Sequence, residues 1–318
     1  MSENRKRLAV IGAGSFGRNH LRVLRQLESV NLVAVCDTDA ARAADAGAQF
    51  GCQSVTDLAD LKGKVDGAVI ATPTSAHVET ALHMMEYGVD VLVEKPIAPD
   101  VASAQRLVEA AERQGRVLQV GHLERFNPAV IALRTIATTP LFFEIHRLSL
   151  FSPRGLDVDV VLDLMIHDID VVLSLTKALP VEIRAAGISI LSEKVDIANV
   201  RLAFANGCVA NLTASRVSTE RVRKIRLFQP SQYISIDYAR QDIAAFRVMP
   251  DRQINYEPVE VQKKEPLRLE LEHFVECMET RQKPLVDGVA ATRALDVAHG
   301  ILAKIEEHAR LVAQSISK

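Results

Sequence analysis

The sequence of 318 residues has few cysteines, no strongly charged tail and no long apolar run. Its four cysteines, Cys36, Cys52, Cys208 and Cys277, lie far apart and form no Cys-x-x-Cys pair, which excludes a zinc knuckle and suits free thiols in a reducing compartment. No segment reaches about 18 uncharged apolar residues, and no apolar stretch precedes a cleavage site. We therefore expect a cytoplasmic protein that binds no membrane.

The overall charge is small, because 40 acidic side chains nearly balance 38 basic ones and leave a net charge of −2. A basic patch at residues 216–226 is interpreted as a solvated strand face, and nucleic acid is not expected as a partner. With 48% hydrophobic and 25% charged residues, the composition is that of an ordinary globular protein. The length is sufficient for two domains with separate cores.

A glycine-rich turn follows the first apolar run, residues 8–11, and precedes a segment with helical spacing. In such a strand–turn–helix unit, Gly12 permits the tight turn, Gly14 lets a pyrophosphate approach the backbone, and Gly17 lets helix and strand pack closely. Ser15 and Phe16 start the helix, whose N-terminal N–H groups favour an anion. The unit predicts a dinucleotide-binding site; the alternative is a glycine turn that binds no ligand.

The next apolar run, residues 32–36, ends at Asp37, twenty residues after Gly17. A carboxylate at this place can bind the ribose hydroxyls of adenosine and repels a 2′-phosphate, so we expect NAD rather than NADP as the cofactor. Arg42 lies nearby, and a guanidinium group there would favour NADP instead.

Apolar runs and helical patterns alternate through the first 121 residues, which predicts a doubly wound parallel sheet of the Rossmann type. Further strands are expected at residues 67–71, 90–93 and 117–121, and helices at 38–50, 75–87 and 101–114. Ligands of such sheets lie beyond the carboxyl ends of the strands. The loops and helix starts beyond these ends supply the remaining cofactor-binding candidates: Thr72, Pro73, Thr74, His77, Glu94, Lys95 and Pro96.

Three of these candidates have competing interpretations. Thr74 is well placed as the N-cap of the helix that follows it, and His77 fits the surface of that helix. Lys95 follows an apolar strand and precedes Pro96, which rules out a continuing helix. Its ammonium group should therefore point into the cofactor crevice, although a lone lysine is more often a solvated charge.

Residues 160–175 (VVLDLMIHDIDVVLSL) form a predicted helix that is apolar on most sides. At about 100° per residue, Asp163, His167, Asp170 and Ser174 fall on one narrow stripe, and only Asp168 interrupts the apolar surround. Burying a carboxylate and an imidazole is costly unless each has a partner or a task, so the stripe should face a cleft. The alternatives are a stripe that faces water, and a metal site that no nearby His or Cys cluster completes.

With the glycine turn, Glu94-Lys95-Pro96 and Asp163-x-x-x-His167 in this order, the chain resembles the Gfo/Idh/MocA family of nicotinamide-dependent sugar and polyol oxidoreductases over nearly its whole length. The resemblance implies a Rossmann domain, residues 1–122, and an α+β domain, residues 123–318, whose large, mostly antiparallel sheet mediates homodimers or homotetramers. It also implies that Lys95, Asp163 and His167 are the catalytic residues and that the Lys95–Pro96 bond is often cis.

A narrower resemblance rests on residues 121–128 (GHLERFNP) and 163–170 (DLMIHDID), which are similar to those of family members that oxidise the C3 hydroxyl of UDP-N-acetylglucosamine. It implies a 3-keto nucleotide sugar as the product, a PLP-dependent aminotransferase as the pathway partner, and a role in making 3-amino lipid A precursors. Other UDP-N-acetylhexosamine uronic acids, free polyols such as inositol, and a non-catalytic dinucleotide-binding regulator are open alternatives. The substrate-binding candidates are His122, Glu124, Arg125, Asn127, Arg147, Arg154, Asp163 and His167.

The two arginines among these candidates are chosen because guanidinium groups match phosphate oxygens, so Arg147 and Arg154 suit a substrate diphosphate. Placement at the protein surface is the alternative for each. Glu124 and Asn127 are candidates for holding the sugar or its acetamido group.

The second half of the chain is predicted to consist mainly of strands. A helix at residues 128–138 and a strand at 142–150 precede the helix at 160–175, and residues 181–261 show alternating strands. The pair Asn206-Gly207 predicts a type I′ hairpin. Helices are expected at 267–280 and 289–313.

These residues suggest a mechanism in which hydride leaves the sugar carbon for NAD while His167 accepts the hydroxyl proton near neutral pH. The ammonium group of Lys95 would orient the hydroxyl and favour the deprotonated imidazole. Asp163, one turn before His167, would bind a sugar hydroxyl or fix the imidazole tautomer.

Overall fold

The computed structural model describes residues 5–151 and 158–316. The chain divides into two compact units: unit 1 comprises residues 1–123 and 265–292, and unit 2 comprises residues 124–264 and 293–318. The first division lies one residue from the predicted boundary after residue 122. The sequence, however, assigns residues 265–292 to the second domain, whereas in the structure they belong to unit 1.

Unit 1 is built on a six-stranded parallel sheet in the order β3-β2-β1-β4-β5-β6. The order reverses between β1 and β4, so the predicted doubly wound Rossmann sheet is confirmed. Strand β3 was missed by the sequence analysis because three residues are too short to show an apolar period. The strands are β1 (Lys6–Ile11), β2 (Val30–Cys36), β3 (Gln53–Val55), β4 (Gly67–Ile70), β5 (Asp90–Glu94) and β6 (Leu118–Gly121).

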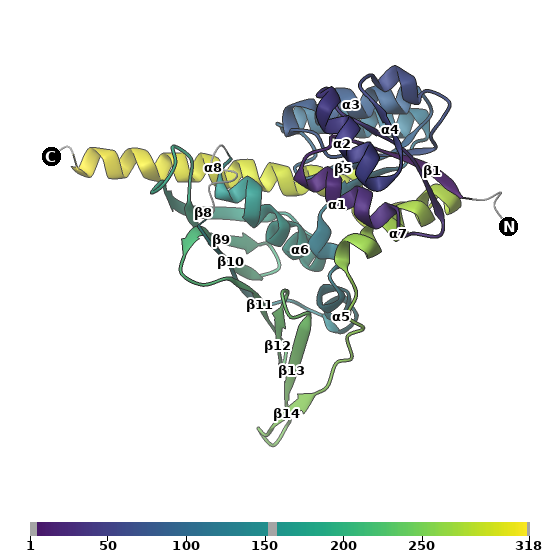
Figure 1. The fold of residues 1–318 in the computed structure, drawn as a ribbon. Helices are drawn as coiled ribbons and strands as arrows, with labels where there is room; N and C mark the ends of the chain where they lie inside the picture. The colour runs from purple at the N-terminus through teal and green to yellow at the C-terminus, as the bar shows by residue number, and fades with distance from the viewer. Residues whose placement is uncertain (1–4, 152–157, 317–318) are drawn as a thin grey trace. The chain divides into compact units, whose positions relative to one another are not determined.

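Helices cover both faces of this sheet (Figure 1). Helix α1 packs against α2 and α7, and α3 packs against α4. The helices of unit 1 are α1 (Ser15–Leu24), α2 (Ala40–Phe50), α3 (Thr74–Glu86), α4 (Val101–Gln114) and α7 (Pro266–Thr280), with the 3-10 helix η1 (Leu58–Leu61).

Helix α7 completes the core of unit 1. Phe274 and Met278 of this helix are buried in one apolar cluster with Leu8 of β1 and Leu21 of α1. The sheet leaves room for them at Gly67, where a Cβ atom would lie 2.7 Å from the Met278 methyl group. These apolar contacts explain why residues 265–292 belong to unit 1, although they follow the second sheet in the sequence.

Unit 2 contains an eight-stranded sheet in the order β14-β13-β12-β11-β7-β10-β9-β8. Strands β7 and β10 pair parallel and the other neighbours pair antiparallel, which confirms the mostly antiparallel sheet. The strands are β7 (Phe142–Leu150), β8 (Pro180–Ile188), β9 (Ile197–Phe204), β10 (Val209–Ser218), β11 (Val222–Gln229), β12 (Gln232–Asp237), β13 (Asp242–Val248) and β14 (Ile254–Glu257).

The β9–β10 hairpin forms where Asn206-Gly207 predicts it, but its turn is of another type. The N–H of Gly207 donates to the carbonyl of Phe204, so Ala205 and Asn206 are the central residues of the turn. Gly207 has a φ of 84°, whereas Asn206 lies outside the positive-φ region. A type I′ turn needs positive φ at both central residues, so that prediction is wrong: the hairpin has a type I turn followed by a left-handed glycine.

The two faces of the unit 2 sheet differ. On one face, α5 packs against β12 and β13. On the same face, Ile305 of α8 lies close to Gly187 of β8, because a Cβ atom at Gly187 would be 3.0 Å from the Ile305 side chain. The other face carries a row of five aromatic rings whose neighbouring centroids are 5.0, 5.5 or 5.9 Å apart: Phe142, Phe228, Tyr233, Phe246 and Tyr256.

The remaining helices are the 3-10 helix η2 (Leu123–Phe126), α5 (Pro128–Ile136), the π-helix η3 (Val161–Met165), α6 (Ile166–Thr176) and α8 (Gly288–Ile316). No helix of the described chain is long and apolar enough to cross a membrane.

Candidate active site

The glycine turn of unit 1 has the geometry that each glycine requires. A Cβ atom at Gly12, whose φ is 98°, would lie 2.5 Å from the Ala71 carbonyl oxygen, and one at Gly17 would lie 1.8 Å from the Gly12 carbonyl oxygen. At Gly14, by contrast, a Cβ atom would have no neighbour within 4 Å. The first two glycines are therefore needed for packing, while Gly14 opens a space beside the N-terminus of α1 that suits a pyrophosphate.

Asp37 holds this turn against the end of β2. Its Oδ2 accepts a hydrogen bond of 2.8 Å from the N–H of Ala13, and its Oδ1 accepts one of 2.9 Å from the N–H of Asp39. The side chain of Arg42 lies 3.7 Å from Asp37 and is half exposed. Each carboxylate oxygen has two lone pairs, so Asp37 retains capacity for the ribose hydroxyls that the sequence assigns to it.

The loops after β4 and β5 are joined by His77. Its Nδ1 lies 2.9 Å from the carbonyl oxygen of Pro96, and its Nε2 lies 2.9 Å from that of Thr72. The side chain is 1% exposed, so the interpretation of His77 as a helix-surface residue is wrong. Burial lowers the pKa of this imidazole, although the two carbonyls oppose that shift. The Lys95–Pro96 bond, in the loop after β5, is cis, as the resemblance implies.

Helix α3 begins one residue earlier than predicted. Pro73 occupies the N-cap position and Thr74 is the first helical residue, with no side-chain capping bond. The N-cap interpretation of Thr74 is therefore wrong.

The carboxylate of Glu94 lies at the end of β5 beside Lys95, and both residues are partly exposed. Its Oε1 is 2.6 Å from Nε2 of the buried His20, and its Oε2 accepts the N–H of Lys95 at 3.3 Å. Burial tends to raise the pKa of Glu94, but His20 and Lys95 outweigh it and lower the pKa. Glu270 of α7, 1% exposed, has its pKa raised by burial and by Glu94. His20 and Lys95 thus favour the charged form of the carboxylate beside Lys95.

In unit 2, the predicted helix at residues 160–175 is two helices in sequence. The first turn, η3, has π geometry, with the N–H of Ile166 donating to the carbonyl of Val161 five residues earlier, and α6 follows it. The predicted constant 100° per residue is therefore wrong for this turn. π-turns are frequent at functional sites, and here Asp163 and His167 are partly exposed on either side of the change from π to α geometry.

The C-terminal part of the predicted polar stripe, Asp170 and Ser174, makes hydrogen bonds and an ion pair within unit 2. Asp170 is 2% exposed and forms an ion pair of 3.3 Å with the buried Arg125. The hydroxyl of Ser174 donates to the carbonyl of Val171 at 2.7 Å. Along the stripe, Asp163, His167 and Ser174 are partly exposed and Asp170 is buried.

Arg147 of β7 is buried and fully engaged, so its predicted surface alternative is wrong. Its Nε and Nη2 donate to Asp168 at 2.7 and 2.8 Å, and its Nη1 donates to Glu124 at 2.9 Å. The hydroxyl of Tyr238 also donates to Asp168, and the guanidinium carbon lies 5.1 Å from the centre of the Tyr238 ring. Burial opposes the charge of Arg147, but Asp168 and Glu124 raise its pKa well above its ordinary value. Arg147 and Tyr238 thus hold Asp168, which follows His167 directly in the sequence.

Asn127 links the same network to helix α5. Its Oδ1 accepts the N–H of Ala129 and caps α5, while its Nδ2 donates to Glu124 at 3.3 Å and to the Tyr238 carbonyl at 3.1 Å. Pro128 takes the first helical position, as predicted. Within unit 2, therefore, Glu124, Asn127 and Arg147 support one another and the start of α5.

Two further substrate-binding candidates are His122 and Arg154. His122 is 1% exposed and follows β6 directly. Arg154 lies outside the described residues. Among the described residues, no group of three His, Cys, Asp or Glu side chains is arranged to hold a metal ion.

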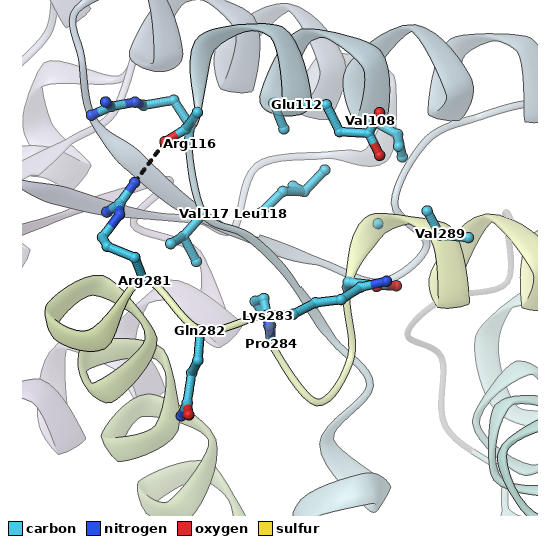
Figure 2. Close-up of a pocket in the computed structure, with 14 residues that line it drawn as sticks. Val108, Glu112, Arg116, Val117, Leu118, Arg281, Gln282, Lys283, Pro284 and Val289 are labelled. Atoms are coloured by element: carbon cyan, nitrogen blue, oxygen red, sulfur yellow. Dashed lines mark hydrogen bonds and ion pairs between the residues drawn. The ribbon is translucent and has the colours of Figure 1, made fainter.

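A cavity of about 400 Å³ in unit 1 is separate from these candidates (Figure 2). It lies at the amino end of β6, between the end of α4 and the connection from α7 to α8, and Val117, Leu118 and Pro284 line it. Arg281 at its edge donates to Asp90 and to the carbonyl of Gly115. Because cofactors of such sheets bind at the carboxyl ends of the strands, this cavity is not the cofactor site.

Comparisons with known proteins decide the family. Residues 6–122 match the oxidoreductase family with an NAD-binding Rossmann fold (GFO_IDH_MocA), and residues 149–229 match the C-terminal domain of the same family. The UDP-N-acetylglucosamine 3-dehydrogenase of Acidithiobacillus ferrooxidans is 36% identical over 306 residues, which cover 94% of this chain and 97% of that protein. This chain belongs to the Gfo/Idh/MocA family. It is an oxidoreductase, and its Rossmann unit binds NAD.

Solved structures and a further relative are similar over most of the chain. A structure of the Acidithiobacillus ferrooxidans enzyme superimposes with a TM-score of 0.90 at 36% identity, covering 95% of this chain and 98% of that one. The scyllo-inositol 2-dehydrogenase (NAD(+)) of Bacillus subtilis is 26% identical over 93% of this chain and 92% of its own length. An Agrobacterium radiobacter oxidoreductase in complex with NAD+ shares the fold, with a TM-score of 0.85 at 17% identity.

Proposed function

We propose that this protein oxidises the C3 hydroxyl of a UDP-N-acetyl sugar, UDP-N-acetylglucosamine, to the 3-keto nucleotide sugar with NAD. One observation carries the proposal: the chain is 36% identical over 94% of its length to a UDP-N-acetylglucosamine 3-dehydrogenase, and it has Lys95, Asp163 and His167 at the positions that the family resemblance assigns to catalysis. A non-catalytic regulator would have no need of all three side chains.

The residues of unit 1 fit NAD. The open space at Gly14 and the N-terminus of α1 suit the pyrophosphate, and Asp37 suits the adenosine ribose. The strand order β4-β5-β6 forms the second mononucleotide half, so the loop containing Glu94 and Lys95 belongs to the nicotinamide side. NAD, when bound, accepts the hydride from the carbinol carbon.

The chain's own task is to move the hydroxyl proton. We assign His167 as the base, because imidazole is the side chain that most often serves as a general base and this one is partly exposed. The ammonium group of Lys95 would donate a hydrogen bond to the substrate oxygen and favour loss of its proton. Asp163, on the π turn before His167, would bind a neighbouring sugar hydroxyl or hold the imidazole tautomer.

The buried network of unit 2 narrows the proposed substrate contacts. Asn127 and Arg147 both donate hydrogen bonds to Glu124. These bonds favour a structural role for the three residues over direct binding of the sugar or the diphosphate. Asp163 and His167 are partly exposed and therefore stay as the leading candidates of this unit.

The proposed product has a wider use. A 3-keto sugar is the substrate that a PLP-dependent aminotransferase needs to form a 3-amino sugar, and we assign the protein to such a route toward lipid A precursors in the cytoplasm. We also propose a homodimer or homotetramer through the aromatic face of the unit 2 sheet, defined by the row of rings from Phe142 to Tyr256, which light scattering tests.

The test is NADH formation from UDP-N-acetylglucosamine by the wild type, His167→Ala and Lys95→Ala, with the product identified by NMR. We expect each substitution to lower turnover by about 100-fold or more, in line with loss of a general acid or base. Undiminished turnover in both variants removes the assignment. Turnover only of inositol, or only of a UDP-N-acetylhexosamine uronic acid, would replace the substrate but keep the reaction.

A further inference from the structure

The segment that leads into η3 is fixed by a buried cluster away from the proposed catalytic side chains. Asp196, at the end of the β8–β9 connection, is fully buried, and its Oδ2 accepts the N–H groups of Ile190, Leu191 and Ser192 at 2.7, 2.6 and 3.1 Å. Its Oδ1 accepts the Ser192 hydroxyl at 2.8 Å. A carboxylate bound in this way is a rigid anchor, because moving it would break four hydrogen bonds at once.

Arg216 of β10 connects this anchor to the start of the helix. Its Nε lies 3.4 Å from Asp196 Oδ1, and its backbone N–H donates to the Asp196 carbonyl at 3.0 Å. Its Nη2 donates to the carbonyl of Val158 and, at 3.2 Å, to that of Val195. The planar guanidinium thus holds three groups in a fixed arrangement, which a lysine ammonium cannot reproduce.

Asp159 adds the last connection. Its Oδ1 accepts the N–H of Val195 at 2.9 Å, and the N–H of Val160 donates to the Val195 carbonyl at 2.9 Å. The backbone carbonyl of Asp159 accepts the N–H of Asp163, also at 2.9 Å. The position of Asp163 is therefore linked through hydrogen bonds to Asp159, Val195 and the Asp196 anchor.

We propose that Asp159, Arg216 and Asp196 are positioning residues that fix where η3 starts and so where Asp163 and His167 lie. The proposal rests on the proposed function, since it gives those two side chains the chemistry. The physical reason is that π turns are rare in helices, so contacts from outside the helix are needed to favour one here over a continuous α-helix. A displacement of about 1 Å at reacting groups can lower a rate by about 100-fold.

The discriminating pair of variants is Asp159→Ala and Asp159→Asn. Alanine removes the acceptor for the Val195 N–H, whereas asparagine keeps an oxygen at the Oδ1 position. We expect Asp159→Ala to lower kcat with UDP-N-acetylglucosamine by about 10- to 100-fold while the KM for NAD, which depends on unit 1, stays within about twofold. Asp159→Asn should keep a kcat within about threefold of the wild type. Arg216→Lys should fall between the two.

A stability control separates positioning from general weakening. Ile234→Val removes one methylene from the same sheet at a fully buried site, so it should lower the melting temperature without changing kcat. A kcat that falls equally in Ile234→Val and Asp159→Ala, an unchanged kcat in Asp159→Ala, or an equal loss in Asp159→Asn would each overturn the proposal.

Amide hydrogen exchange gives a readout that does not depend on turnover. The N–H groups of Val160 and Asp163 should exchange at least about tenfold faster in Asp159→Ala and at the wild-type rate in Asp159→Asn. If His167→Ala retains full turnover, the proposed function fails, and exchange alone then decides whether the segment is held as described. Unchanged exchange in Asp159→Ala overturns the inference even where the proposed function stands.

Discussion

Replacing Arg147 by methionine should destabilise unit 2 by about 3–5 kcal/mol. The substitution keeps most of the aliphatic packing but leaves the carboxylates of Asp168 and Glu124 buried without the cation that binds both, and loss of one partner of a buried pair typically has this cost. For a unit of this size, each kcal/mol lowers the melting temperature by about 2–4 °C, so we expect a fall of about 6–20 °C. Urea unfolding followed by circular dichroism measures the change directly.

Two matched variants make the Arg147 experiment decisive. Arg147→Lys keeps the charge but cannot donate to Asp168 twice and to Glu124 at once, so it should be destabilised less than methionine but clearly more than a surface variant. Adding Asp168→Asn to Arg147→Met should recover part of the loss, because one uncompensated buried charge is removed. The proposed role of Arg147 in the network would be refuted if Arg147→Met lowered the free energy of unfolding by less than about 1 kcal/mol and raised the KM for the nucleotide sugar. Arg147 would then be a ligand of the substrate diphosphate.

The remaining predictions concern the cofactor turn and the Asp196 anchor. Gly14→Ala should lower NAD affinity by about tenfold or more with little change in melting temperature, because its Cβ enters open space, whereas Gly17→Ala should lower stability by about 1–3 kcal/mol because its Cβ meets the Gly12 carbonyl; titration calorimetry and thermal unfolding distinguish them. Burial raises the pKa of Asp196, but the backbone N–H groups outweigh this and lower it from 3.8 to about 2. A depressed folded-state pKa stabilises the fold above pH 3.8 and the effect is lost as the pH falls toward 2. The stability difference between wild type and Asp196→Asn should therefore be about 2 kcal/mol at pH 6 from this shift alone and shrink as urea unfolding is repeated at lower pH.

The alternation of strands and helices in unit 1 was readable because each element carries its own local signal. Helix α4 spans residues 101–114 as predicted and ends at Gly115 in a left-handed conformation, and the glycine turn has the contacts that its spacing implies. The same local signals predicted helix α7 within one residue of its observed start but assigned it to the second domain, because nothing in residues 265–280 indicates which sheet they cover. Only the shared apolar cluster with Leu8 and Leu21 reveals that.

The candidate site was predicted unevenly for a physical reason. The positions of Asp163 and His167 follow from a motif, but the π turn between them has no periodic signature and invalidates the assumed 100° per residue. The burial of His77 and Arg147 depends on partners distant in sequence, such as Pro96 and Asp168, which a single sequence does not pair.

The Asp196 anchor shows the same limit in its strongest form. Arg216 was grouped with the solvated basic patch because it lies in a run of cations, yet it is 6% exposed. Arg223 is only partly exposed and lies 4.0 Å from Glu124, whereas Arg221 and Lys224 are exposed as predicted. The burial of Arg216 depends on Val158, Val195 and Asp196, which a run of cations in the sequence does not reveal.

The late return of helix α7 to the first sheet affects how the protein is made. A ribosome that has synthesised only the first 264 residues has released every strand of the nucleotide-binding sheet, but one face of that sheet still lacks Phe274 and Met278. The newly made chain therefore exposes an apolar surface beside α1 until residues 266–280 have been synthesised. The 141 residues from 124 to 264 lie between the two parts of this core in the sequence. Chaperones that bind exposed apolar patches have their opportunity during this interval.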